Sequence, residues 1–188
     1  MKILLSVVTI AAISAGVYTY KSHTKVEGVD EAEEVEKVNP VGPQFNADSA
    51  IAFCQAQCEF GSRTMNSTAH DKCGDWIIAK FKQFGCKVTC QNAELTGYDG
   101  TKLESTNAIA SINPEATTRI LICAHWDSRP WADNDPDSTN WHKPVLAAND
   151  GASGVGVMLE LARLLQQKGT TPLSLKGKPE EKLGVDFI

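Results

Sequence analysis

The stretch that decides the fold runs from residue 119 to residue 168 and reads RILICAHWDSRPWADNDPDSTNWHKPVLAANDGASGVGVMLELARLLQQK. Its short apolar run, residues 120–124, is typical of a buried strand. A polar loop follows, and residues 149–151 then open an amphipathic helix. Ligands of open α/β sheets bind beyond the carboxyl ends of the strands. The polar residues that follow this strand and precede this helix are therefore candidates for a binding site.

Three side chains at this junction form a candidate metal site: His125, Asp127 and Asp150. A neutral imidazole and carboxylates are ligand types that zinc accepts. His125 and Asp127 are two residues apart on an extended chain and share a face, so one can bind a metal while the other orients it. Two alternatives need no metal. Asp150 could cap the helix or form a turn, and His125 with Asp127 could be a surface hydrogen-bonded pair.

The regions on either side predict helices and a mixed sheet. One helix is expected from Asn46 or Asp48 to Cys58, with an apolar stripe of Ile51, Cys54 and Cys58. A second is expected over residues 70–84, capped by Ser67 or Thr68, with His70 on the surface. Its core stripe is Cys73, Trp76, Ile77, Phe81 and Phe84.

Strands are expected over residues 86–91, 102–106 and 107–112, paired antiparallel around a turn at residues 98–100. A parallel βαβ unit follows, comprising strand 120–124, helix 153–168 and strand 183–188. Residues 170–182 are expected to be a connector. Glu160 and Arg163 are expected on the solvated face of the helix.

Composition limits the classes of function. A chain of 188 residues with a net charge of −5 predicts one domain and argues against a nucleic-acid partner, which requires a basic face. Residues 1–20 resemble a signal peptide or membrane anchor, and residues 21–43 an acidic linker. The domain, residues 44–188, is therefore expected to be exported to the periplasm or cell envelope, with membrane association possible through residues 1–20. We expect a fragment of a longer protein, because the apolar run of residues 183–188 is typical of the start of a strand and a native domain rarely stops within a strand.

Export permits disulfides among the six cysteines, but the sequence assigns no pairing. Cys123 lies in the strand that is expected to be central and is predicted to be a buried thiol. Trp126 and Trp131 lie in or near the polar loop. They either form the wall of a substrate pocket or simply pack the loop against the domain.

The motifs around the junction resemble those of the animal-type glutaminyl cyclases, within the zinc aminopeptidase superfamily. The matching segments are His125-Trp126-Asp127-Ser128-Arg129, Asn149-Asp150-Gly151-Ala152-Ser153, Met158-Leu159-Glu160-Leu161-Ala162-Arg163, Leu173-Ser174-Leu175-Lys176 and Val185-Asp186-Phe187-Ile188. The resemblance implies an α/β fold in which a mixed central sheet carries helices on both faces, with this chain forming the N-terminal portion. The cystine of the animal enzymes has no counterpart, since the matching positions are Ala124 and Val155.

The resemblance also implies a zinc-dependent acyltransferase that converts the N-terminal glutamine of peptides to pyroglutamate and releases ammonia. Asp150 is then the zinc ligand and Asp127 orients His125 or a neighbour. The general acid/base and the remaining ligands are expected after Ile188, so the chain alone is expected to bind zinc poorly and to be inactive. The alternatives are a zinc aminopeptidase, in which His125 would bind a second zinc, and a non-catalytic relative that uses the fold for binding.

Overall fold

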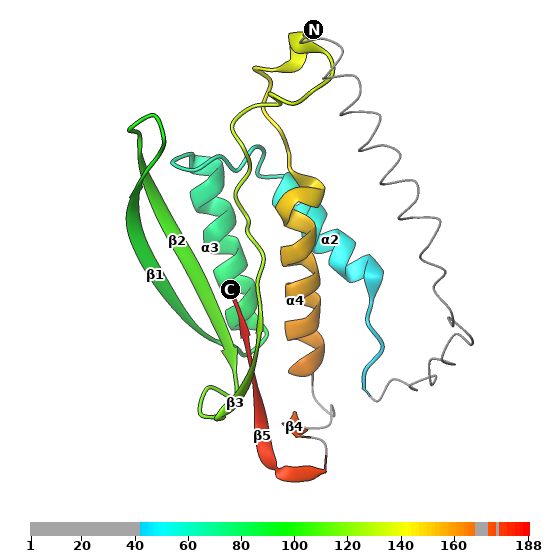
Figure 1. Cartoon of the computed structure of the whole chain (residues 1–188). Coiled ribbons are helices and arrows are strands. Elements are labelled where there is room, and N and C mark those ends of the chain that lie inside the picture. Colours follow the sequence, from blue (N-terminus) through cyan, green and yellow to red (C-terminus); the bar gives the residue numbers. More distant parts are fainter. Residues whose placement is uncertain (1–41, 168–172, 176) are drawn as a thin grey trace, which may run out of the picture. The chain divides into compact units, whose positions relative to one another are not determined.

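The computed structural model describes residues 42–167, 173–175 and 177–188 (Figure 1). The signal or anchor segment and nearly all of the acidic linker lie outside these ranges. No helix of the described part is long and apolar enough to cross a membrane. The elements, in chain order, are α2 (Ala47–Cys58), α3 (Thr68–Gln83), β1 (Lys87–Thr96), β2 (Lys102–Ile112), β3 (Thr118–Ile122), η1 (Ser138–Asn140), η2 (Ala148–Ala152), α4 (Ser153–Leu165), β4 (Ser174–Leu175) and β5 (Lys178–Phe187).

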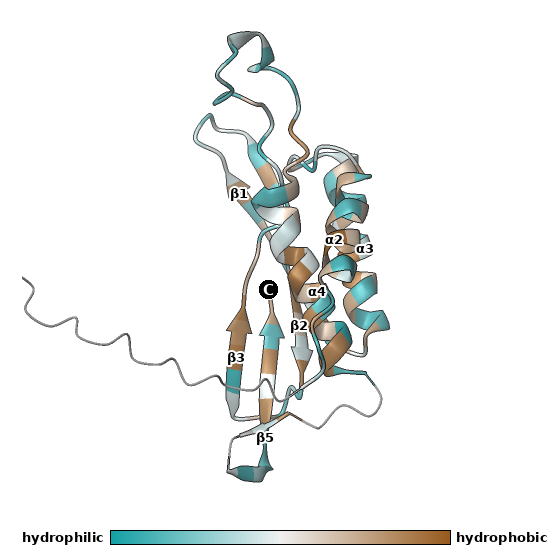
Figure 2. Ribbon diagram, turned by 90° about the vertical axis from the view of Figure 1, so that its right-hand side faces the viewer, coloured by the Kyte–Doolittle hydropathy of each residue, from teal (hydrophilic) through white to brown (hydrophobic). Residues whose placement is uncertain are grey.

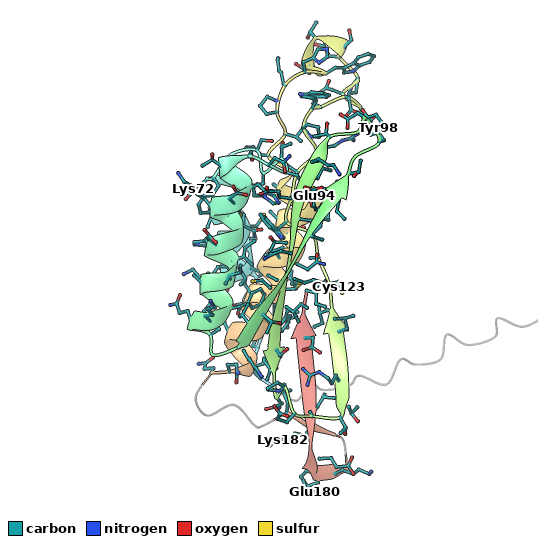
Figure 3. All side chains as sticks on the ribbon, turned by 90° about the vertical axis from the view of Figure 1, so that its left-hand side faces the viewer. Lys72, Glu94, Tyr98, Cys123, Glu180 and Lys182 are labelled. Atoms are coloured by element: carbon teal, nitrogen blue, oxygen red, sulfur yellow. The ribbon has the colours of Figure 1, made fainter. Side chains whose placement is uncertain are left out.

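The main sheet has the strand order β1-β2-β5-β3, with β4 paired to β5. β1 and β2 form a long antiparallel hairpin whose turn carries the fully exposed Tyr98 (Figure 3). β5 pairs antiparallel with β2 and parallel with β3, where Ile120 lies opposite Val185. The predicted mixed α/β class is confirmed. The described helices, however, lie along one face of the sheet rather than both (Figure 2).

The core forms between that face and the helices. Ala110 and Ile112 of β2 and Phe187 of β5 point inward with the period of two that a strand imposes. Phe187 stacks on Phe81 of α3, with ring centroids 5.5 Å apart. Leu159 of α4 is fully buried in the same cluster. The predicted stripe of α3 is confirmed, since Cys73, Ile77 and Phe81 are buried and Trp76 and Phe84 pack against them.

The opposite face of the sheet carries a polar cluster. Arg119 of β3 donates from Nε to Asp186 Oδ2 and from Nη2 to Asp186 Oδ1, both at 2.6 Å. Ser111 Oγ of β2 donates to the same carboxylate at 2.6 Å. Hydrogen bonding from Arg119 has the largest effect and lowers the pKa of Asp186; burial opposes it by less, and a hydrogen bond from Ser111 lowers the pKa further. This cluster ties the three strands together on their outer side.

The predicted helix caps are present. The Asn46 side chain accepts a hydrogen bond from the Ser49 N–H at 3.0 Å, and the Ser67 hydroxyl accepts one from His70 N–H at 3.1 Å. Each satisfies a backbone donor that the first turn leaves free. The apolar stripe predicted for α2 is wrong. Ile51 is 56% exposed, whereas Ala50 and Gln57 are buried, because this side of α2 packs on α4 and η2.

Three further predictions are corrected around β3 and its connections. β3 is an edge strand of the described sheet, so Ile120 and Leu121 are exposed instead of buried. Cys123, just beyond β3, is likewise exposed (Figure 3). Part of the predicted connector is strand, because β5 begins at Lys178 and pairs with β4.

Glu160 was expected on a solvated face and is instead fully buried. Its carboxylate accepts two hydrogen bonds from Arg163, at 2.7 and 2.8 Å, and one from Asn46 N–H at 3.2 Å. These three donors compensate for the loss of water around the charge. Glu160 therefore joins the start of α2 to α4.

Candidate metal-binding site

His125 lies between two carboxylates at the carboxyl end of β3. Its Nε2 is 2.7 Å from Asp150 Oδ1, and its Nδ1 is 3.2 Å from Asp127 Oδ1. The strand end supplies His125 and Asp127, and the junction before α4 supplies Asp150. The structure thus brings the three predicted side chains together. All three remain open to solvent, with Asp150 the most exposed at 79%.

The charges of this cluster affect the protonation of the imidazole. Partial burial lowers the pKa of His125, but the hydrogen bonds and charges of Asp150 and Asp127 together outweigh it and raise the pKa. A protonated imidazole donates from both nitrogens, which matches the two carboxylate neighbours. The cluster therefore stabilises the charged form of the imidazole.

Asp150 does not cap a helix. Its φ and ψ of −113° and 90° are non-helical, and neither η2 nor α4 begins with a side-chain cap. The preceding Ala147 is left-handed at φ 47°, and the Asp150–Gly151 peptide bond is cis. Asp150 thus leaves the helical path, and its carboxylate lies against His125. Gly151 is required by close packing, because a Cβ there would lie 2.8 Å from both Cδ2 and Nε2 of the His125 ring.

Two buried polar side chains that sequence reasoning missed hold these segments in place. Arg63 donates from Nε to Trp126 O at 2.9 Å and from Nη2 to Ala147 O at 3.1 Å. It thereby joins the strand end that carries His125 to the loop that carries Asp150. Gln57 Nε2 donates to Ala152 O at 2.9 Å. Neither residue belongs to a recognisable motif, and only the tertiary structure shows what each of them binds.

Trp126 packs under the site. Its indole stacks on the His70 ring, with centroids 3.9 Å apart and planes 19° apart. Gly74 makes room for it, since a Cβ at Gly74 would lie 2.6 Å from the indole. His70 is only 5% exposed, so its predicted surface position is wrong, because the indole covers it.

A cavity of about 350 Å³ lies beside His125 and Asp127. His125, Trp126 and Asp127 line it together with apolar side chains such as Val155 and Met158. Trp131 does not line this cavity. It is 50% exposed and packs edge to face on His142 within the loop that follows the site. Of the two candidate pocket residues, Trp126 is the one that lines the cavity together with His125 and Asp127.

The donor atoms are of the types that zinc accepts, namely carboxylate oxygens and an imidazole nitrogen. Asp150 keeps a second carboxylate oxygen that is not bonded to His125. Within the described ranges, no three His, Cys, Asp or Glu side chains are grouped so that they could hold a metal ion. Asp150 therefore fits as one ligand of a site that needs further donors, and His125 and Asp127 fit as the residues that position it.

Comparison with known proteins relates this fold to the zinc peptidases. Residues 107–183 match the model of Peptidase family M28. A structure described as a Zn-dependent exopeptidase from Parabacteroides distasonis is 47% identical, with a TM-score of 0.69 over 78% of this chain and 47% of that one. The chain thus has the fold of the zinc exopeptidases.

More particularly, the chain resembles the glutaminyl cyclases. A Bacteroides thetaiotaomicron glutaminyl cyclase bound to N-acetylhistamine is 48% identical, with a TM-score of 0.70 over 78% of this chain and 47% of that one. The same values hold for a structure described as a leucine aminopeptidase precursor from that organism. The predicted resemblance is confirmed. The chain spans less than half the length of each of these structures.

Proposed function

We propose that this chain is part of a zinc-dependent glutaminyl-peptide cyclotransferase. The substrates are peptides with an N-terminal glutamine, and the products are pyroglutamyl peptides and ammonia. The α-amine forms a bond to the side-chain amide carbon, and the bond from that carbon to the amide nitrogen breaks. When bound, zinc supplies Lewis-acid polarisation of the amide carbonyl.

The observation that carries this proposal is the convergence of His125, Asp127 and Asp150 beyond β3, in a chain that is 48% identical to a glutaminyl cyclase over 78% of its length. In a two-zinc aminopeptidase, Nε2 of His125 would bind the second zinc, and that metal would replace the 2.7 Å contact between His125 and Asp150. We place a single zinc on Asp150, as in the cyclase interpretation, with His125 as a positioning residue.

The residues of this chain have distinct roles in the proposed reaction. Asp150 holds the metal through its carboxylate. Asp127 fixes the imidazole ring of His125, which in turn fixes Asp150. The cavity beside Trp126 receives the apolar part of the substrate end. The general acid/base is not among these residues, and we place it in the part of the relatives' length that this chain does not span.

A zinc aminopeptidase is the second candidate, because a leucine aminopeptidase precursor matches the chain as well as a glutaminyl cyclase does. Glutamine coupled to a chromogenic amine separates the two. A cyclase releases ammonia and leaves the dye attached, whereas an aminopeptidase releases the dye. A non-catalytic relative would do neither, even with zinc present.

The assay should compare the complete gene product with the 188-residue chain, and each with its Asp150→Asn variant. We expect ammonia release from the complete product and a loss of that release in Asp150→Asn. The chain alone should show no measurable turnover, because a catalytic zinc site has about three protein ligands and the described residues bring fewer together. Dye release by the complete product would overturn the cyclase assignment.

Export to the periplasm or cell envelope completes the proposal. It rests on the charged start and apolar run of residues 1–17 and is tested by fractionating cells and sequencing the N-terminus of the recovered protein. Recovery of the protein from the cytoplasm alone would contradict it.

A further inference from the structure

A second cluster of metal-binding side chain types lies outside the site already described. Cys54 and Cys58 are one turn apart on α2, so their thiols share a face of the helix. Cys54 Sγ donates a hydrogen bond to Ala148 O at 3.1 Å. Cys58 Sγ donates one to Leu146 O at 3.8 Å. Both thiols are partly exposed and free. They therefore face the backbone of the loop that leads to Asp150.

Arg63 supplies the second observation. Its side chain is fully buried, yet its bonds go to the carbonyl oxygens of Trp126, Gln57, Gly61 and Ala147, all of them neutral. Within residues 42–167, 173–175 and 177–188, no carboxylate forms an ion pair with it. A buried charge is usually paired, because losing its hydration without an opposite charge is costly.

The thiols and the guanidinium are close enough to interact. Burial and the neighbouring Cys58 raise the pKa of Cys54, whereas the charge of Arg63 lowers it. Arg63 also opposes the effect of burial on the nearby Cys73, whose pKa is raised to about 11. A group that makes this cluster anionic would thus provide the opposite charge that Arg63 lacks.

We propose that Cys54 and Cys58 form a binding site for a soft monovalent metal ion, Cu(I), with Arg63 as the compensating charge. Soft thiolate ligands select Cu(I). Two thiols each lose a proton to solvent, two Cu–S bonds form, and copper remains in the +1 state. The resulting bis-thiolate carries a net charge of −1, which the buried guanidinium neutralises.

The geometry discriminates against other uses of the pair. Side chains one helical turn apart have Cβ atoms about 5–6 Å apart, whereas a disulfide needs about 3.5–4.5 Å. A disulfide would therefore require the last turn of α2 to unwind, whereas a metal ion that bridges the two sulfurs does not need their Cβ atoms to approach each other as closely. Structural zinc takes four ligands, and the described residues offer no group of three or more at this place.

The test uses the full 188-residue chain, reduced and kept without oxygen, with Cu(I) supplied in competition with the chromogenic chelator bicinchoninate. The parent variant is Cys90→Ser with Cys123→Ser, which removes the two exposed cysteines elsewhere. Cys54→Ser and Cys58→Ser are then introduced singly into it. Serine keeps a donor for the Ala148 or Leu146 carbonyl, and circular dichroism checks that each variant is folded.

We expect the parent variant to take one Cu(I) per chain. Each single serine should weaken copper binding by about 100-fold or more, since losing even an outer partner of a ligand typically costs 10- to 100-fold. The proposal is overturned if the parent variant takes no copper, or if both serine variants compete with the chelator as well as the parent does. If one serine variant fails to fold, the other decides the matter, because losing either thiolate removes a ligand.

Discussion

Replacing Gly151 by alanine tests the packing that brings Asp150 to His125. The new Cβ would lie 2.8 Å from two atoms of the imidazole and would also press on the His125 backbone carbonyl. Real Cβ atoms do not approach this closely, so the ring or the loop must move. Overpacking of this kind costs about 1–3 kcal/mol, which lowers Tm by roughly 2–12 °C for a domain of this size.

The informative readout is the His125 imidazole, followed by NMR through a pH titration. In the native chain its pKa is raised by Asp150 and Asp127 in spite of burial. The stabilisation from this cluster is therefore fully present below the ordinary histidine pKa and is lost as pH rises through the raised value. Gly151→Ala should move the pKa of His125 back towards its ordinary value, because the 2.7 Å contact to Asp150 is broken.

Gly154→Ala is the matched control. Its Cβ would lie 2.9 Å from the Ala124 methyl and would meet no atom of the imidazole. Both variants should lower Tm, but only Gly151→Ala should change the His125 titration. The reasoning is refuted if Gly151→Ala leaves both Tm and the His125 pKa unchanged, or if Gly154→Ala shifts that pKa equally.

Three further outcomes are expected. Asp127→Asn should lower the pKa of His125 with little change in Tm, as measured by NMR and calorimetry, since the Asp127 contact is exposed; an unchanged titration would mean that Asp127 does not hold the ring. Asp186→Asn should cost about 1–3 kcal/mol at neutral pH, because it weakens the partly buried pair with Arg119. The pKa of Asp186 is lowered on folding. In urea titrations, the difference in free energy of unfolding between the native chain and Asp186→Asn should therefore be present above the ordinary Asp pKa and should shrink as pH falls through the lowered value. A difference that stays constant with pH would contradict the ion pair. Leu159→Ala should cost about 2–5 kcal/mol in the same assay, because Leu159 is fully buried in the core, and a cost near zero would contradict that packing.

Local patterns in the sequence predicted those features that depend on local chemistry. The caps at Asn46 and Ser67, the stripe of α3 and the parallel pairing of β3 with β5 follow from residue spacing and turn residues, and all are present. The convergence of His125 and Asp150 follows from their places at a strand end and a helix start. Neighbouring residues determine the caps and the stripe, whereas the pairing and the convergence follow from the order of strand, helix and strand in a βαβ unit.

The remaining features depend on which helices and strands contact one another, and residue spacing along the sequence does not predict those contacts. His70 is buried only because Trp126, 56 positions away, stacks on it, and Glu160 only because Arg163 and Asn46 satisfy its charge. Ile120 was expected to be buried, as in a central strand, but β3 is an edge strand of the described sheet. Arg63 belongs to no motif, although it joins both halves of the site.

The most direct test of the site is an anomalous-scattering map at the zinc absorption edge, measured on crystals of the protein in saturating zinc. We expect one zinc ion about 2.0–2.2 Å from an Asp150 carboxylate oxygen. His125 should remain beside Asp127 and should not bind the ion. A zinc ion bound elsewhere, or none near Asp150, would contradict the proposal that this junction is the metal centre, and a second zinc on His125 would identify an aminopeptidase instead.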